Sequence, residues 1–184
     1  MQIIRRSLTV LVIIFASAVC CAAADAPQPA DQVLTAAETA AADQDKNVWV
    51  IFGASWCVWC RQLDKFINEP DIQPILDRRF VIAHLTVDEH GDKASLDNPG
   101  GDAAKRRLGG SNAGLPFFAF LDPAGNVLIN SNRPLAGKPD ANIGFPSAPE
   151  EVDWFMMMLH RAAPQLGADQ TRLIEERLRS KPGQ

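Results

Sequence analysis

Cysteine is scarce in this sequence, and positive charge is not in excess. The 184 residues include four cysteines, and 18 lysines and arginines stand against 22 acidic residues, which gives a formal net charge of −4. Because no basic face stands out, nucleic acid is not an expected partner. Hydrophobic residues make up 47% and charged residues 22% of the chain. This balance is typical of a folded globular protein of one ordinary domain rather than of a disordered chain.

The N-terminal hydrophobic run is too short to cross a bilayer comfortably. It extends from Leu8 to Val19, whereas a membrane-spanning helix needs about 20 apolar residues. The run follows the basic pair Arg5-Arg6 and precedes Ala22-Ala23-Ala24, small residues that a signal peptidase accepts. This order predicts a cleaved export signal over residues 1–24, with Asp25 as the new N-terminus and no membrane span afterwards. We therefore expect a periplasmic or secreted protein.

Export would leave only two cysteines in the mature chain, because Cys20 and Cys21 depart with the signal. The remaining pair, Cys57 and Cys60, are three positions apart. Outside the cytoplasm such a pair can persist as a disulfide. A disulfide that closes so small a loop stabilises a fold little, so redox reactivity explains the pair better than structural stapling.

Two alternatives to a cleaved signal stay open at the N-terminus: an uncleaved membrane anchor, and lipid attachment at Cys20 or Cys21.

The mature sequence also lacks the ligands of a zinc site. A tetrahedral site needs two ligands besides Cys57 and Cys60. No second cysteine pair exists in the mature chain, and no histidine lies close to this pair in sequence. His90 and the acidic residues around it are more typical of a solvated loop than of a cation site. We therefore expect no metal and no cofactor.

The hydrophobic pattern predicts alternating helices and strands. Continuous apolar runs at 48–52 and 80–87 are typical of strands buried on both faces. Turn residues at 122–126 predict a hairpin between strands 117–121 and 127–130. Helical spacing predicts helices at 31–41, from 57, and at 102–108, 150–163 and 169–179, the first of them capped by Asp31. Residues 88–101 and 132–149 are predicted loops.

This order of elements predicts an α/β fold of three layers, a central mixed β-sheet with helices on both faces. The chain divides into a signal peptide (1–24), an N-terminal extension with its helix (25–46), the α/β domain (47–165), and a C-terminal helix and tail (166–184).

Within the loop at 132–149, Phe145 has two interpretations. It either anchors the loop on the core, which we favour, or contributes to a docking surface.

The position of the cysteine pair gives it a specific chemical use. Cys57 lies where a predicted strand ends and a helix begins, and the free N–H groups and dipole of a helix N-terminus favour an anion. The thiolate is the nucleophilic form of cysteine, so a lowered pKa activates it. Cys60 lies one turn further along the helix, close enough to attack a mixed disulfide on Cys57 and release the substrate.

Four stretches of the sequence resemble the thioredoxin superfamily. They correspond to its active-site motif, its central strand, its cis-proline loop and the following hairpin: Trp56-Cys57-Val58-Trp59-Cys60, residues 80–88, Gly114-Leu115-Pro116-Phe117 and residues 121–125. The segment from Asn68 to Val81 is most similar to the exported bacterial branch of thioredoxin-like proteins. That branch includes the C-terminal domain of the periplasmic transmembrane disulfide reductase. The resemblance implies the thioredoxin-like three-layer fold.

The resemblance also implies roles for individual residues. Cys57 would be the attacking cysteine and Cys60 the resolving one, with no metal or cofactor involved. Pro116 would be a cis-proline beside the active site, where the neighbouring backbone pairs with an extended substrate. The implied substrate-binding residues are Trp56, Val58, Trp59, Leu115 and Pro116. The implied partners are protein thiol or disulfide substrates and a redox partner protein. The protein itself is expected to be a monomer.

The sequence departs from the thioredoxin pattern at two positions that handle protons. Ile51 replaces the buried acid of the first central strand, so the site is expected to hold no carboxylate, and His84 replaces the lysine of the next strand. His84 is thus a candidate proton relay for Cys60, the alternative being a buried core histidine.

An alternative function also stays open. The bulky Trp59, the missing acid at position 51 and the proline-rich loop suit a non-catalytic binding module with a thioredoxin fold. The Val58-Trp59 dipeptide does not fix the direction of electron flow, and among enzymatic functions we favour the reductase direction.

Overall fold

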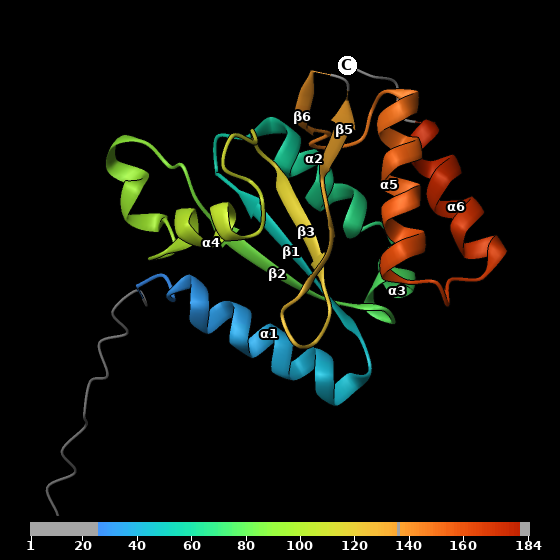
Figure 1. The fold of residues 1–184 in the computed structure, drawn as a ribbon, viewed down its shortest axis with the longest axis horizontal. Helices are drawn as coiled ribbons and strands as arrows, with labels where there is room; N and C mark the ends of the chain where they lie inside the picture. The colour runs from blue at the N-terminus through green and yellow to red at the C-terminus, as the bar shows by residue number, and fades with distance from the viewer. Residues whose placement is uncertain (1–25, 136, 181–184) are drawn as a thin grey trace, which may run out of the picture.

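The protein is built on a four-stranded mixed sheet (Figure 1). The structure, a computed structural model, describes residues 26–135 and 137–180. Strands follow the order β2-β1-β3-β4. β1 (Asn47–Gly53) is parallel to β2 (Phe80–Thr86) and antiparallel to β3 (Phe117–Leu121), which pairs with β4 (Val127–Asn130). The predicted signal peptide at 1–24 and the last four residues lie outside the described residues.

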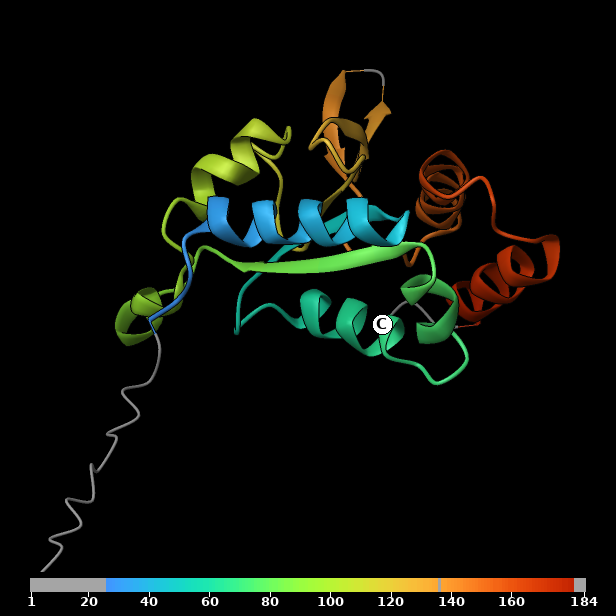
Figure 2. The same ribbon diagram turned by 90° about the horizontal axis from the view of Figure 1, so that it is seen from below.

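Helices cover both faces of the sheet, which confirms the predicted three-layer α/β fold. Figure 2 shows α1 (Ala30–Gln44) on one side and α2 (Val58–Ile67) with α3 (Gln73–Asp77) on the other. Alternation along β1 supplies both cores: Val50 packs toward α1, and Trp49 packs toward α2. All five central residues of β1 are buried, as its continuous apolar run predicted.

β2 differs from the prediction of a fully buried strand. It forms one edge of the sheet, and only Phe80, Ala83 and Leu85 among its residues are buried. His84 lies opposite Ile51 in the register of the two parallel strands. An edge strand has a neighbour on one side only, so hydrophobic residues in its sequence do not ensure burial of the whole strand.

The last two helices pack together on the α2 side of the sheet. They are α5 (Pro149–Ala162) and α6 (Ala168–Arg179). Ile174 and Leu178 of α6 are fully buried in the same hydrophobic cluster as Phe155 of α5. Arg177 forms ion pairs with Glu69 and Asp71, while Arg179 pairs with Asp153 and Glu175. The C-terminal helix therefore joins the main core.

The predicted N-cap of the first helix is wrong. α1 begins at Ala30 after Pro29, and Asp31 does not cap it. The Ala30 N–H instead donates to the Pro99 carbonyl oxygen (2.8 Å). Asp31 lies inside the first turn and pairs with Arg107 of α4 (Gly101–Arg107) at 2.9 Å.

The predicted loops also contain regular structure. Residues 132–149 include an antiparallel pair, β5 (Asn132–Leu135) and β6 (Lys138–Asn142), and residues 88–101 include a 3₁₀ helix, η1 (Gly91–Leu96). The prolines at 134 and 139 argued against strands in the sequence. Each strand of a two-stranded ribbon has one free edge, however, and proline is tolerated at such an edge.

Candidate active site

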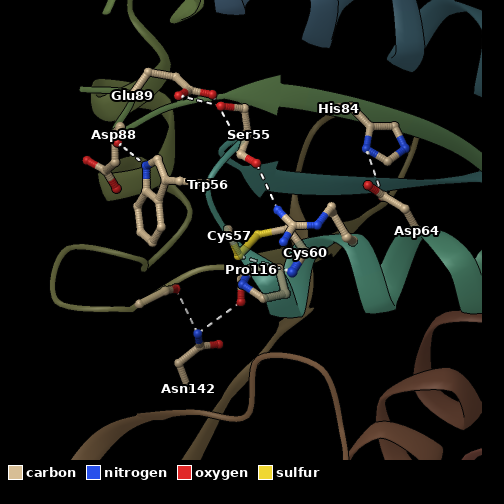
Figure 3. Close-up of a disulfide and its surroundings, with 12 residues drawn as sticks. Ser55, Trp56, Cys57, Cys60, Asp64, His84, Asp88, Glu89, Pro116 and Asn142 are labelled. Atoms are coloured by element: carbon tan, nitrogen blue, oxygen red, sulfur yellow. Dashed lines mark hydrogen bonds and ion pairs between the residues drawn. A yellow bond between two sulfur atoms is a disulfide. The ribbon is translucent and has the colours of Figure 1, made fainter. Parts of the chain in front are cut away.

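Cys57 and Cys60 form a disulfide at the junction of β1 and α2 (Figure 3). Cys57 is the N-cap residue of α2, and its Sγ accepts a hydrogen bond from the Cys60 N–H at 3.0 Å. Gly53, the last residue of β1, lies beside the other sulfur: an added Cβ there would be 3.4 Å from Cys60 Sγ, about van der Waals contact distance. Once the disulfide is reduced, the helix N-terminus would favour a thiolate at Cys57.

Hydrogen bonds hold the bend that precedes the disulfide. The Cys57 N–H donates to the Ala54 carbonyl oxygen (3.0 Å), and Arg61 Nη1 donates to the Ser55 carbonyl oxygen (2.9 Å). Glu89 adds two contacts: its carboxylate accepts hydrogen bonds from the backbone N–H of Ser55 and from the Ser55 hydroxyl, the latter at 2.9 Å. Lys93 Nζ also reaches the Ser55 Oγ at 3.1 Å. The segment after β2 thus fixes the segment after β1.

Glu89 corrects the expectation that the site holds no carboxylate. Its side chain is buried, with an exposed fraction of 7%, and it lines the same cavity as Cys60. The sequence did contain a signal for it: Glu89 follows β2, and the carboxyl ends of parallel strands meet at one edge of the sheet. Reasoning that looked for an acid only inside the first strand, at Ile51, missed it.

The expected proton relay, His84, lies at the surface rather than in the core. Its side chain is 55% exposed, and Nδ1 lies 3.7 Å from Asp64 Oδ1. The core-histidine alternative is therefore wrong, because β2 is the edge strand and this side of it is not covered. His84 still lines the cavity of about 470 Å³ that Cys60 and Glu89 share.

An apolar surface surrounds the disulfide. Trp56, Val58 and Trp59 have exposed fractions of 50%, 56% and 41%, whereas the two cysteines are buried. Trp56 Nε1 donates to the Asp88 carbonyl oxygen (2.8 Å), and its ring stacks on His90 with centroids 5.4 Å apart. These three exposed residues are among the five that the resemblance assigned to substrate binding, the others being Leu115 and Pro116.

Phe145 is buried, as the favoured interpretation predicted. It belongs to the core cluster with an exposed fraction of 6%. Its ring also stacks parallel to Trp59, with centroids 6.4 Å apart. The loop after β6 is thus anchored on the core and supports one wall of the site.

The Leu115–Pro116 peptide bond is cis, in agreement with the resemblance. Leu115 packs against Ala54, Cys57 and Cys60, which places this loop directly beside the disulfide. A groove of about 420 Å³ runs between the loop, Trp59 and the segment after β6.

Within residues 26–135 and 137–180, no group of three or more His, Cys, Asp or Glu side chains is arranged to hold a metal ion.

Comparison with known proteins identifies the family. A family model described as thioredoxin-like matches residues 30–123, just over half of the chain. The chain belongs to this thioredoxin-like family. Family membership and the Cys57–Cys60 disulfide together support thiol–disulfide redox activity. No curated protein matches the chain.

Three solved structures illustrate the similarity. A disulphide isomerase from Xylella fastidiosa Temecula1 is 16% identical, with a TM-score of 0.49, and the match covers 85% of this chain and 98% of that one. The DsbD C-terminal domain from Neisseria meningitidis is 19% identical (TM-score 0.43; 73% and 99% covered). A thioredoxin from Thermus thermophilus is 23% identical (TM-score 0.43; 76% and 92% covered). At these TM-scores the similarities add nothing to the family assignment.

Among the described residues, no helix combines the length and the apolar character needed to cross a membrane.

Proposed function

We propose that this protein is an exported thiol–disulfide oxidoreductase that acts on protein substrates through Cys57 and Cys60. The observation that carries the proposal is the disulfide at the N-terminus of α2, flanked by an exposed apolar surface and the Leu115–Pro116 loop. Export rests on the signal pattern at 1–24, which implies the periplasm or the medium.

In the reductase direction, the Cys57 thiolate attacks one sulfur of a substrate disulfide. A mixed disulfide forms, and the other substrate sulfur leaves as a thiolate that takes up a proton. Cys60 then loses its proton and attacks Cys57 Sγ, which releases the second substrate sulfur as a thiol. The substrate gains two electrons and the cysteine pair becomes a disulfide, which a dithiol partner protein must reduce. The oxidase direction is the same sequence reversed.

The groups around the disulfide suit these steps. Trp56, Val58 and Trp59 offer an apolar surface to a polypeptide near the reacting sulfur. Leu115 packs against both cysteines, and the backbone of the Leu115–Pro116 loop would pair with an extended segment of the substrate. His84 and Glu89 line the cavity on the Cys60 side, where a proton must leave.

The half-exposed Trp59 favours one rival, a binding module whose disulfide never turns over. Titration with glutathione buffers separates the two functions. An enzyme cycles reversibly between dithiol and disulfide, whereas a binding module holds an inert pair. Failure of the pair to reduce at potentials down to about −300 mV, typical of structural disulfides, would favour the binding module.

The first prediction assigns the nucleophile. In reduced protein at neutral pH, Cys57 should react with iodoacetamide faster than Cys60, because Cys57 caps the helix N-terminus. Cys60→Ser should accumulate mixed disulfides on Cys57, while Cys57→Ser, the matched control, should accumulate none. Mass spectrometry of the alkylated and trapped peptides measures both. Faster alkylation of Cys60 would contradict the assignment.

A further inference from the structure

One side chain outside the cysteine motif holds the loop beside the disulfide. Asn142, the last residue of β6, donates from Nδ2 to the carbonyl oxygens of Gly114 (2.8 Å) and Pro116 (3.0 Å). These are the residues on either side of Leu115, and Figure 3 shows both contacts. Resting on the proposed function, we propose that Asn142 is a positioning residue that sets this loop for polypeptide substrates.

The hydrogen bonds of Asn142 define the orientation of its amide. Both Nδ2 hydrogens meet carbonyl oxygens, and Oδ1 accepts from the Ser131 hydroxyl at 2.7 Å. An aspartate of the same shape would place a carboxylate against two carbonyl oxygens and remove both donors. The position therefore requires a side chain that donates twice and accepts once.

The other end of this network is buried in the sheet. Ser131 is fully buried, its Oγ accepts the N–H of Phe118 in β3 (3.0 Å), and its carbonyl oxygen accepts the N–H of Ile143 (2.9 Å). Phe118 is two residues after Pro116. The same network thus ties the β5–β6 pair, the start of β3 and the loop together, so the loop takes its position from these strands.

The loop position matters for one kind of substrate more than another. Leu115 contacts the cysteine pair, and the adjoining groove of about 420 Å³ is lined by Trp59, Leu115, Asn142 and Phe145 among others. A polypeptide must lie along this loop to bring its sulfur to Cys57. A small disulfide needs only access to the sulfur. Loss of the Asn142 contacts should therefore weaken reaction with polypeptides selectively.

The test compares two substrates in stopped-flow experiments on the reduced full-length protein. One substrate is hydroxyethyl disulfide, and the other is a disulfide-bonded peptide of about ten residues. The readout is the ratio of the peptide rate constant to the small-disulfide rate constant. Asn142→Ala, which removes all three side-chain hydrogen bonds, should lower this ratio about threefold. Asn142→Asp, which replaces both donors by a carboxylate facing two carbonyl oxygens, should lower it about tenfold.

Asn132 provides the matched control on the same strand pair. Its Nδ2 donates to the Gly109 carbonyl oxygen (2.8 Å), away from the Pro116 loop. Asn132→Asp should leave the ratio unchanged. An unchanged ratio in Asn142→Ala, or equal losses with both substrates, would overturn the proposal even if Asn142→Asp failed to fold. A wild-type protein inert toward both disulfides would instead overturn the proposed function.

Discussion

At the residue scale, the path of the Cys60 proton is the central question. Ile51 leaves the first strand without an acid, yet the cavity beside Cys60 carries His84, which contacts Asp64, and the buried Glu89. Glu89 is already occupied by two hydrogen bonds from Ser55, so positioning the bend is its clearest role. The His84 side chain is half exposed and, among the described residues, pairs only with Asp64, whereas Glu89 accepts two hydrogen bonds from Ser55. His84 is therefore the better candidate base for the Cys60 proton.

The second prediction separates these roles. His84→Ala should slow release of the mixed disulfide by about tenfold while its formation at Cys57 is unchanged, because only release requires deprotonation of Cys60. Glu89→Gln should slow both steps, since the bend that carries Cys57 loses its charged acceptor. Stopped-flow rates for the two half-reactions measure this, with His160→Ala on α5 as the control histidine. Equal release rates in wild type and His84→Ala, with the fold intact, would leave His84 as a surface residue.

At the element scale, helix α1 contacts the turn between β3 and β4. Glu38 of α1 is partly buried, and an added Cβ at Gly125 of the turn would lie 2.8 Å from its Oε1. Burial raises the pKa of Glu38, against the attraction of Arg107, and repulsion from Asp122 adds to the rise. Hydrogen bonds from Asn126 lower the pKa of Asp122 itself. The contact between α1 and the turn is thus weakened when Glu38 is ionised.

The third prediction follows from the direction of the Glu38 shift. A carboxyl group with a raised pKa in the folded state favours folding when protonated, and this contribution disappears as pH rises through that pKa. Glu38→Gln should therefore raise Tm at pH 7, and the gain should vanish below about pH 4, where the unfolded carboxyl is protonated. Thermal melts from pH 3 to 8 measure it. Asp43→Asn removes an exposed charge from the same helix as control, and a gain independent of pH would contradict the prediction.

At the scale of the whole molecule, α6 closes the core on the α2 side of the sheet. Figure 1 shows it beside α5 at the edge of the fold. Its two buried side chains, Ile174 and Leu178, lie in a cluster that also holds Trp49 of the central strand. The ion pairs of Arg177 and Arg179 are partly exposed and contribute little by comparison. Burial of the apolar side of α6 therefore makes the main contribution to the free energy that holds this helix on the domain.

The fourth prediction concerns the stabilisation that comes from burying the apolar side of α6. Leu178→Ala should lower the free energy of unfolding by about 2–5 kcal/mol, the usual cost of removing a buried leucine side chain. Met157→Ala on the adjacent α5, where the side chain is 39% exposed, should cost much less. Urea titrations of both variants give the comparison. A Leu178→Ala cost no greater than that of Met157→Ala would mean that α6 is not part of the cooperative unit.

The sequence by itself determined the parts that depend on neighbours along the chain. The apolar run of β1, the turn at 122–126 and the position of Cys57 at the end of a strand each carry their signal within a few residues. Local hydrophobicity and turn chemistry were sufficient for these elements. The cysteine pair was therefore assigned correctly to the start of a helix.

Only the tertiary structure decided which residues surround that pair. His84 is exposed because β2 forms the edge of the sheet, and strand order is not encoded in the strand itself. Glu89 and Asn142 reach the site through contacts that span 34 residues to Ser55 and 26 residues to Pro116. Such contacts depend on how the strands and loops assemble, which a local sequence pattern does not specify.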